Sequence, residues 1–180
     1  MKHVFYIISF FITTNLISQD YLLNFIEDGT EDNNVVFATF KGTKIINLQS
    51  IEMTAKDELE FIISHRFGKI NSGIKDVFGL DYGKIRMSFS YGISDDFNLG
   101  IARSSYDKVI DASAKFSIFK QGNKSLPISI GSYSALFLDP AISVNSFNHR
   151  LSYVHQFLFA RKFNQNFSMQ LVPSLVHYNL

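Results

Sequence analysis

Two runs of residues, 84–92 and 97–102, alternate strictly in side-chain character, and this alternation constrains the fold more than any other feature of the chain. In the first run Ile85, Met87, Phe89 and Tyr91 alternate with Arg86, Ser88, Ser90 and Gly92. In the second, Phe97, Leu99 and Ile101 alternate with Asn98, Gly100 and Ala102. Successive side chains of a β-strand point to opposite faces of its sheet. The pattern therefore predicts two strands with one apolar face and one small, wettable face, joined by a tight turn at residues 93–96.

Further runs with a related alternation cover residues 58–67, 112–121, 127–138, 149–159 and 167–177. Short links at 93–96, 120–126 and 161–166 alternate with mostly longer links at 68–83, 104–111 and 139–148. Segments of about ten alternating residues, joined by alternately short and long links, are typical of a transmembrane β-barrel. The sequence therefore predicts an all-β, antiparallel transmembrane barrel with seven strands in residues 58–180. Residues 43–51 are β-prone and could add an eighth strand that pairs with 58–67 across the polar turn 54–57.

The polar face of these strands favours a membrane barrel over a soluble one. It carries Ser, Asn, Gln, Gly, Arg and Lys, which a dry protein core would reject. Aromatic residues gather near the strand ends, as in the interfacial girdles of membrane barrels: Phe67, Tyr91, Phe97, Tyr153, Phe157, Phe159 and Phe167. The alternative is an exported soluble β-barrel that binds a small apolar ligand, because such a fold alternates in the same way. A chain that stays monomeric without detergent would favour this alternative.

The first residues predict export. Met1-Lys2-His3 is a short basic start, and residues 4–12 form an apolar run that is too short to span a bilayer as a helix. A polar stretch that contains Ser18 follows, so residues 1–18 resemble a signal peptide with cleavage before Gln19. We then expect residues 19–57 to be a periplasmic segment, apart from the early strand that they could contain. The acidic stretch at 27–34 lacks EF-hand spacing and is predicted to be a solvated loop.

Composition excludes several classes of function. The chain has no cysteine, so disulfides, thiolate metal sites and a cysteine nucleophile are excluded. A formal net charge of +1 gives no overall attraction to nucleic acid. The five histidines show no metal-ligand spacing. We therefore expect no cofactor, no metal, no nucleic-acid partner and no enzymatic activity. A lipase in the outer membrane would need a Ser/His pair on the lipid face; Ser132 and Ser134 share the outward parity of Ile130, but the sequence assigns them no partner.

Cationic residues recur along the predicted strands. By parity Arg66, Arg86, Lys115 and Arg150 fall on the lumen face, and Arg103 falls on the other face near a strand end. A basic lumen would favour anions in a pore. In a small closed barrel the same cations would instead pair with Glu58, Glu60 and aspartates. The sequence leaves both arrangements open.

Two motifs near the predicted mouth have a structural and a functional interpretation. His65-Arg66-Phe67-Gly68 could contact a ligand, or it could place Phe67 at the membrane interface and Arg66 in the lumen, with Gly68 opening the loop. Phe78-Gly79-Leu80-Asp81 could be a binding loop. The alternative is an inward-folded loop in which Asp81 pairs with Arg66, Arg86 or Arg103.

Six motifs occur in a fixed order: Phe40-Lys-Gly-Thr-Lys, Asn47-Leu-Gln-Ser-Ile-Glu52, His65-Arg-Phe-Gly68, Phe78-Gly-Leu-Asp81, Tyr91-Gly-Ile and Ala102-Arg-Ser-Ser105. Over about residues 40–121 the chain resembles a family of membrane-bound β-barrel proteins of unknown function from Bacteroidota. The resemblance implies a barrel fold and an outer-membrane location, and it assigns no catalytic residue. The expected function is structural, or passive permeation. The expected partners are outer-membrane lipid and the insertion machinery that the fold implies.

Strand direction gives one more expectation. If 93–96 is a periplasmic turn, the last strand, 167–177, runs outward without a return strand. Bacterial single-chain barrels have an even number of strands, and an unpaired strand edge is not tolerated in lipid. We therefore expect an open, curved sheet whose first and last strands do not pair, as in a truncated barrel or the N-terminal part of a longer one.

Overall fold

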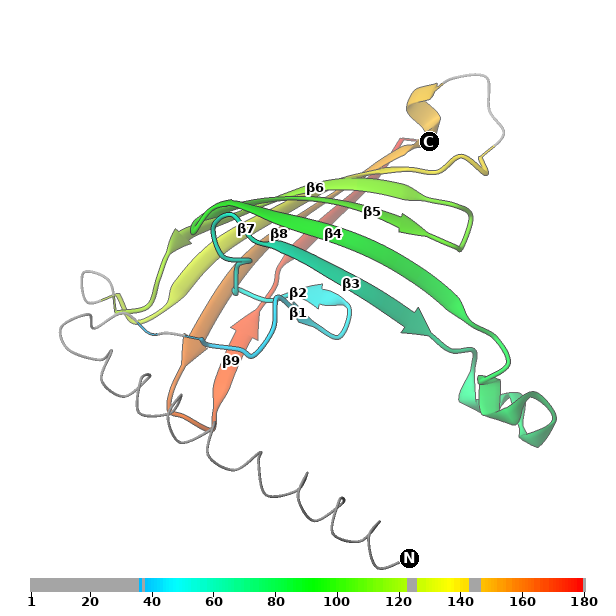
Figure 1. Cartoon of the computed structure of the whole chain (residues 1–180), viewed down its shortest axis with the longest axis horizontal. Coiled ribbons are helices and arrows are strands. Elements are labelled where there is room, and N and C mark those ends of the chain that lie inside the picture. The colour runs from blue at the N-terminus through cyan, green and yellow to red at the C-terminus, as the bar shows by residue number, and fades with distance from the viewer. Residues whose placement is uncertain (1–35, 37, 123–125, 143–146, 180) are drawn as a thin grey trace, which may run out of the picture. The chain divides into compact units, whose positions relative to one another are not determined.

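The computed structural model describes residues 36, 38–122, 126–142 and 147–179. They form a curved antiparallel sheet (Figure 1) with strands β3 Leu59–Arg66, β4 Lys84–Ser94, β5 Phe97–Ser104, β6 Ile110–Phe119, β7 Ser129–Leu138, β8 Leu151–Lys162, β9 Ser168–Leu171 and β10 Ser174–Tyr178. From β3 to β8 each strand pairs with the next in sequence, and β9 and β10 both pair with β8. The predicted all-β antiparallel fold is confirmed.

Strands β9 and β10 are one strand interrupted at Pro173. Leu171 lies opposite Phe159 and Ser174 lies opposite Gln156, so the register against β8 is the same on both sides of the interruption. Proline has no N–H to donate to the ladder. Its carbonyl still accepts a hydrogen bond of 3.0 Å from the Phe157 N–H. The single strand predicted over 167–177 is therefore present, with a break that the prediction missed.

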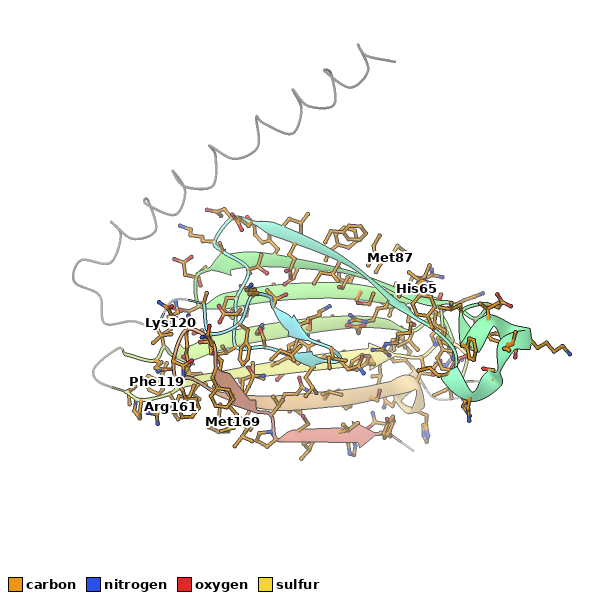
Figure 2. All side chains as sticks on the ribbon, turned by 90° about the horizontal axis from the view of Figure 1, so that it is seen from below. His65, Met87, Phe119, Lys120, Arg161 and Met169 are labelled. Carbon is orange, nitrogen blue, oxygen red and sulfur yellow. The ribbon has the colours of Figure 1, made fainter. Side chains whose placement is uncertain are left out.

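The two faces of the sheet differ as predicted. Large apolar side chains on the convex face are exposed, and Phe61 and Phe89 stack there with ring centroids 4.6 Å apart. Figure 2 shows Met87 and Met169 near opposite edges of the sheet. Polar side chains on the concave face are buried: Ser88, Asn98, Asp111, Lys115 and Gln156. The parity read from the sequence is confirmed, because a period of two fixes the face of each residue once one is known.

Residues 38–57 run across the concave face, and we call them the inner segment. Within it β1 Lys44–Ile45 and β2 Leu48–Gln49 pair with each other (Figure 1). The prediction that residues 43–51 pair with 58–67 is wrong. The chain reverses at Ile46, whose φ is +54°, so the β-prone stretch forms its own short hairpin.

Two glycines let the inner segment approach the sheet closely. At Gly92 the Asp57 N–H donates to the Gly92 carbonyl over 2.8 Å, and a Cβ atom there would meet the Ala55 carbonyl oxygen. At Gly131 a Cβ atom would come within 2.9 Å of the Ile51 side chain. Ile51 packs in a small buried cluster with Leu158 and Ala160. The small residues of the concave face therefore make room for the segment.

Short 3₁₀ turns occupy the long links. Turns η2 Ile70–Ser72 and η3 Ile74–Gly79 lie between β3 and β4, and η5 Phe147–Arg150 precedes β8. The link after β5 is shorter than predicted, because β6 begins at Ile110 and thus includes Asp111. No helix among the described residues is long and apolar enough to cross a membrane.

The sheet is open in the part of the chain that the structure describes. Its path runs from β3 at one edge to β10 at the other, and these two strands do not pair. The open sheet expected from strand direction is thus confirmed. The predicted signal peptide at 1–18 and the acidic stretch at 27–34 lie outside the described residues.

Candidate functional site

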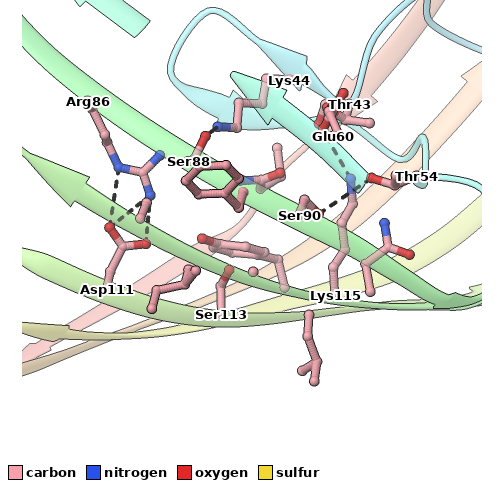
Figure 3. Close-up of a pocket in the computed structure, with 18 residues that line it drawn as sticks. Thr43, Lys44, Thr54, Glu60, Arg86, Ser88, Ser90, Asp111, Ser113 and Lys115 are labelled. Atoms are coloured by element: carbon pink, nitrogen blue, oxygen red, sulfur yellow. Dashed lines mark hydrogen bonds and ion pairs between the residues drawn. The ribbon is translucent and has the colours of Figure 1, made fainter. Parts of the chain in front are cut away.

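A group of partly buried polar contacts joins the inner segment to strands β3 to β6 (Figure 3). We call the residues that make them the inner-face cluster: Thr43, Lys44, Glu52, Thr54, Glu60, Arg86, Ser88, Ser90, Asn98, Asp111 and Lys115. Three cations and three carboxylates meet in it. The alternation of the strands places the strand members on one face, and the hairpin β1–β2 brings the remainder over them.

An ion pair between Arg86 and Asp111 forms one end of the cluster. The Arg86 guanidinium donates to both carboxylate oxygens of Asp111 over 2.6 and 2.8 Å, and Asp111 is 2% exposed. The two residues belong to β4 and β6, and the small side chains of Ala102 and Ser104 in β5 lie between their positions. Asp81, for which the sequence offered Arg66, Arg86 or Arg103 as a partner, forms no ion pair among the described residues, and Arg86 pairs with Asp111 instead.

Lysines attach the inner segment to the sheet from both sides. From β6 the Lys115 ammonium donates to the carbonyl oxygen of Glu52, and it lies 3.4 Å from that of Thr43. From the segment the Lys44 ammonium donates to Ser88 Oγ over 3.0 Å. Burial, and then the nearby Arg86 charge, lowers the pKa of Lys44 from its usual value. The ammonium groups of Lys44 and Lys115 thus hold the inner segment on the concave face of the sheet.

Neutral and carboxylate partners complete this attachment. Thr43 Oγ1 donates to the Glu60 carboxylate, with oxygen distances of 2.8 and 2.9 Å. The Asn98 amide, oriented to match its neighbours, accepts from the Thr54 N–H over 2.7 Å and donates to the Thr54 carbonyl over 3.2 Å. Asn98 is 2% exposed, and its amide bonds both the N–H and the carbonyl of Thr54, as a neighbouring strand would do. At the far end Gln170 donates to the Gln49 carbonyl over 2.8 Å.

Little space remains between the inner segment and the sheet. The cavity in the inner-face cluster measures about 40 Å³, which is room for a few water molecules. No group of three or more histidine or acidic residues in the described ranges is placed to hold a metal ion. The hydrogen bonds and the ion pair of the cluster therefore hold the inner segment on the concave face, and they give the buried charged and polar groups their partners.

The motif at the end of β3 has the structural arrangement that the sequence offered as one interpretation. Arg66 lies on the concave parity and donates to the Asn47 side chain over 2.9 Å. The rings of His65 and Phe67 lie 4.4 Å apart, and both residues are exposed. The Gly68 N–H donates to the Gly79 carbonyl over 2.8 Å and closes the base of the loop.

The predicted cation placements are also confirmed where they can be compared. Arg86 and Lys115 lie in the inner-face cluster. Arg150 lies in turn η5, before β8 begins, so strand parity does not assign it to a face. Arg103 is exposed on the convex parity. The cations of the cluster contact Asp111, backbone carbonyls and Ser88 Oγ rather than Glu58.

Sequence reasoning missed one pair on the convex face. Ser134 Oγ lies 2.9 Å from His155 Nδ1, because the two residues are directly opposite in the β7–β8 register. Their outward parity was readable from the sequence. Their contact was not, because it depends on the register between two strands that are joined by a long link.

Comparison with known proteins agrees with this architecture. No curated protein and no solved structure matches the chain. A protein family matches residues 40–180, a range that includes all but the first two residues of the inner segment and all the strands of the sheet. The resemblance to a membrane-bound β-barrel family is thereby confirmed. The chain belongs to the family described as Membrane bound beta barrel domain (DUF5777).

Proposed function

We propose that this protein is a structural β-barrel protein of the outer membrane whose inner face is occluded by its own residues 38–57. The observation that carries the proposal is the attachment of the inner segment to the concave face. Lys115, Glu60 and Asn98 hold this segment from three different strands. A cavity of about 40 Å³ in the inner-face cluster leaves no room there for a solute larger than a few waters.

The distribution of side chains supports a membrane role over the soluble alternative. A soluble barrel that binds an apolar ligand would line its concave face with apolar side chains. Here the concave face carries Arg86, Asp111 and Lys115, and the convex face exposes Phe61, Phe89 and many other large apolar residues. Lipid is the solvent that suits such a convex face.

Location and partners follow from this proposal. The apolar run at residues 4–12 supports export, and a β-barrel in a bacterial envelope belongs in the outer membrane. The proposed partners are therefore outer-membrane lipid and the machinery that inserts barrels. Nucleic acid is not among them, since the formal net charge is only +1.

Conductance across a planar bilayer tests the occlusion. We expect the intact chain to show little or no steady conductance. Lys115→Met removes the ammonium that holds the Glu52 carbonyl and should give frequent openings, because the segment is then less firmly attached. Lys120→Met is the matched control, since Lys120 pairs with the exposed Asp96. Large, steady channels in the unmodified chain would refute occlusion and favour passive permeation.

A second candidate function is lipid hydrolysis, and the Ser134–His155 contact is the observation that favours it. A catalytic Ser/His pair also needs a third group that orients the histidine. Among the described residues His155 makes its hydrogen bond to Ser134 alone. We propose that this is a cross-strand polar pair without a catalytic role. A serine-reactive fluorophosphonate that labels Ser134 in the unmodified chain but not in His155→Ala would establish the hydrolase instead.

A further inference from the structure

We propose that a cationic pocket at the ends of β3, β4 and β5 binds a phosphate group. The pocket has a volume of about 560 Å³, and its lining includes Arg66, Lys69, Lys84 and Arg86. None of the described residues that line it is acidic. We call it the rim pocket. It shares Arg86 with the cavity in the inner-face cluster, and otherwise its cations are different residues. Its ligand does not depend on whether the barrel conducts.

The strand register places like charges opposite each other in the rim pocket. Arg66 of β3 is paired directly with Lys84 of β4, and both lie on the concave parity. Like charges in directly opposite positions destabilise an antiparallel pair. An anion bound between the two side chains would offset this repulsion. The Arg66–Lys84 pair therefore favours a bound anion at this end of the two strands.

The positive charge of the pocket is only partly neutralised within the protein. Arg86 is paired with Asp111, which lies outside the lining. Arg66 and Lys84 form no ion pair with a described residue. The Arg66 bond to Asn47 uses one of the five N–H donors of a guanidinium and leaves the others for a ligand. The rim pocket thus contains N–H donors that a bound anion could use.

Neighbouring groups hold the cations of the pocket in position. The Lys84 ammonium lies 3.4 Å from the centroid of the Tyr106 ring, a cation–π contact. Lys69 lies next to Gly68, whose N–H is bonded to the Gly79 carbonyl at the base of the loop. The ring contact reduces the conformational freedom of the Lys84 side chain, and the Gly68 bond fixes the backbone next to Lys69.

A phosphate group fits this set of donors better than a smaller or neutral ligand does. A guanidinium offers two parallel N–H donors to phosphate oxygens, and an ammonium adds a compact charge. The hydroxyls of Ser64 and Ser104 line the same pocket and can donate to the remaining oxygens. The expected ligand is therefore a phosphate that carries two negative charges.

Such a phosphate could be free in solution or could belong to a lipid headgroup. Phe67, which follows the end of β3, and Ile85 of β4 also line the rim pocket, and both are exposed. A lipid could therefore place its phosphate among the cations and its acyl chains along the apolar face. The two sources share their chemistry, and the experiment below separates them.

The test uses the full chain in a maltoside detergent, which contains no phosphate. Isothermal titration measures binding of two probes, inorganic phosphate and a short-chain phosphatidic acid, with the corresponding neutral diacylglycerol as the blank. The variant is Arg66→Gln with Lys84→Gln. The control is Arg161→Gln, since Arg161 also lies over an aromatic ring, 4.8 Å from the Phe163 centroid, but at the other end of the sheet from His65 (Figure 2).

We expect at least one phosphate probe to bind the unmodified chain and the Arg161→Gln control equally well. The double variant should lose about tenfold in affinity for each cation removed, since a charge-assisted hydrogen bond is worth about one decade. Binding of inorganic phosphate would identify a site for free phosphate, and binding of phosphatidic acid alone would identify a lipid site. Failure of both probes, or equal affinity in the double variant, would overturn the proposal.

A second variant keeps the test decisive if the double variant does not fold. Lys69→Gln changes an exposed loop residue outside every strand, so it should leave the sheet intact. It should weaken binding of the same probe by about tenfold. An unchanged affinity in this folded variant would also count against the rim pocket as a phosphate site.

Discussion

Gly92 and Ala55 lie in such close contact that a Cβ atom at position 92 would be 2.0 Å from the Ala55 carbonyl oxygen. This approach lets Lys56 and Gly92 form a β-bridge, and it brings the Asp57 N–H to the Gly92 carbonyl. The inner segment therefore ends, at residues 55–57, over a position that only glycine fits.

The first prediction follows from this contact. Gly92→Ala should displace the end of the inner segment, around Ala55, and lower the free energy of unfolding by about 1–3 kcal/mol, the usual cost of overpacking. Denaturant titration in lipid vesicles measures the loss, and hydrogen exchange at the Asp57 amide locates it. Gly42→Ala is the control, because a Cβ atom there would lie 3.8 Å from its nearest neighbour. Equal stability of the two variants would show that the close approach does not constrain the segment.

The second prediction concerns the ion pair of the inner-face cluster. Asp111→Asn should cost about 3 kcal/mol of unfolding free energy, because it leaves the Arg86 charge in a partly buried site without its carboxylate. Asp96→Asn breaks the Lys120–Asp96 pair, whose side chains are 43% and 63% exposed. That control should change stability by less than about 1 kcal/mol. Denaturant titrations that give similar losses for both variants would contradict the structural role of Asp111.

The third prediction concerns the convex face. Phe89 is 44% exposed there and stacks on Phe61. Phe89→Arg should lower the free energy of folding into lipid vesicles by about 2–4 kcal/mol, the cost of a cation on the lipid face near the bilayer midplane. Phe89→Leu keeps the face apolar and should fold with nearly normal yield. If Phe89→Arg inserted as well as Phe89→Leu, the convex face could not be the lipid face.

The fourth prediction concerns processing. If residues 1–18 are a signal peptide, protein recovered from outer-membrane fractions should begin near Gln19. N-terminal sequencing of that protein is the measurement. Recovery of Met1 at the N-terminus would show that the apolar run at residues 4–12 is retained and has another role.

Part of the inner-face cluster could be predicted from the sequence. The sequence placed Arg86 and Lys115 on the lumen face, and both lie in the inner-face cluster. It also offered pairing with acidic residues as one of two arrangements. It did not identify Asp111 as the partner of Arg86, because that pairing depends on the register of β4, β5 and β6.

The sequence by itself determined the strands and their faces. Alternation is a local property, since neighbouring side chains of a strand must point to opposite sides of the sheet. It therefore predicted that Met87 and Phe89 face outward and Ser88 inward without knowledge of any partner strand. The break at Pro173 was missed, although the lack of an N–H in proline is also local.

Only the tertiary structure decided what covers the concave face and which side chains meet. The path of residues 38–57 depends on the turn at Ile46 and on contacts from Glu60, Asn98 and Lys115, which lie in three different strands. The Arg66–Lys84 and Ser134–His155 pairs depend on register, which aligns residues far apart in the chain. The physical reason is that hydrogen bonding between strands fixes register cooperatively over the whole sheet, whereas alternation is complete within each strand.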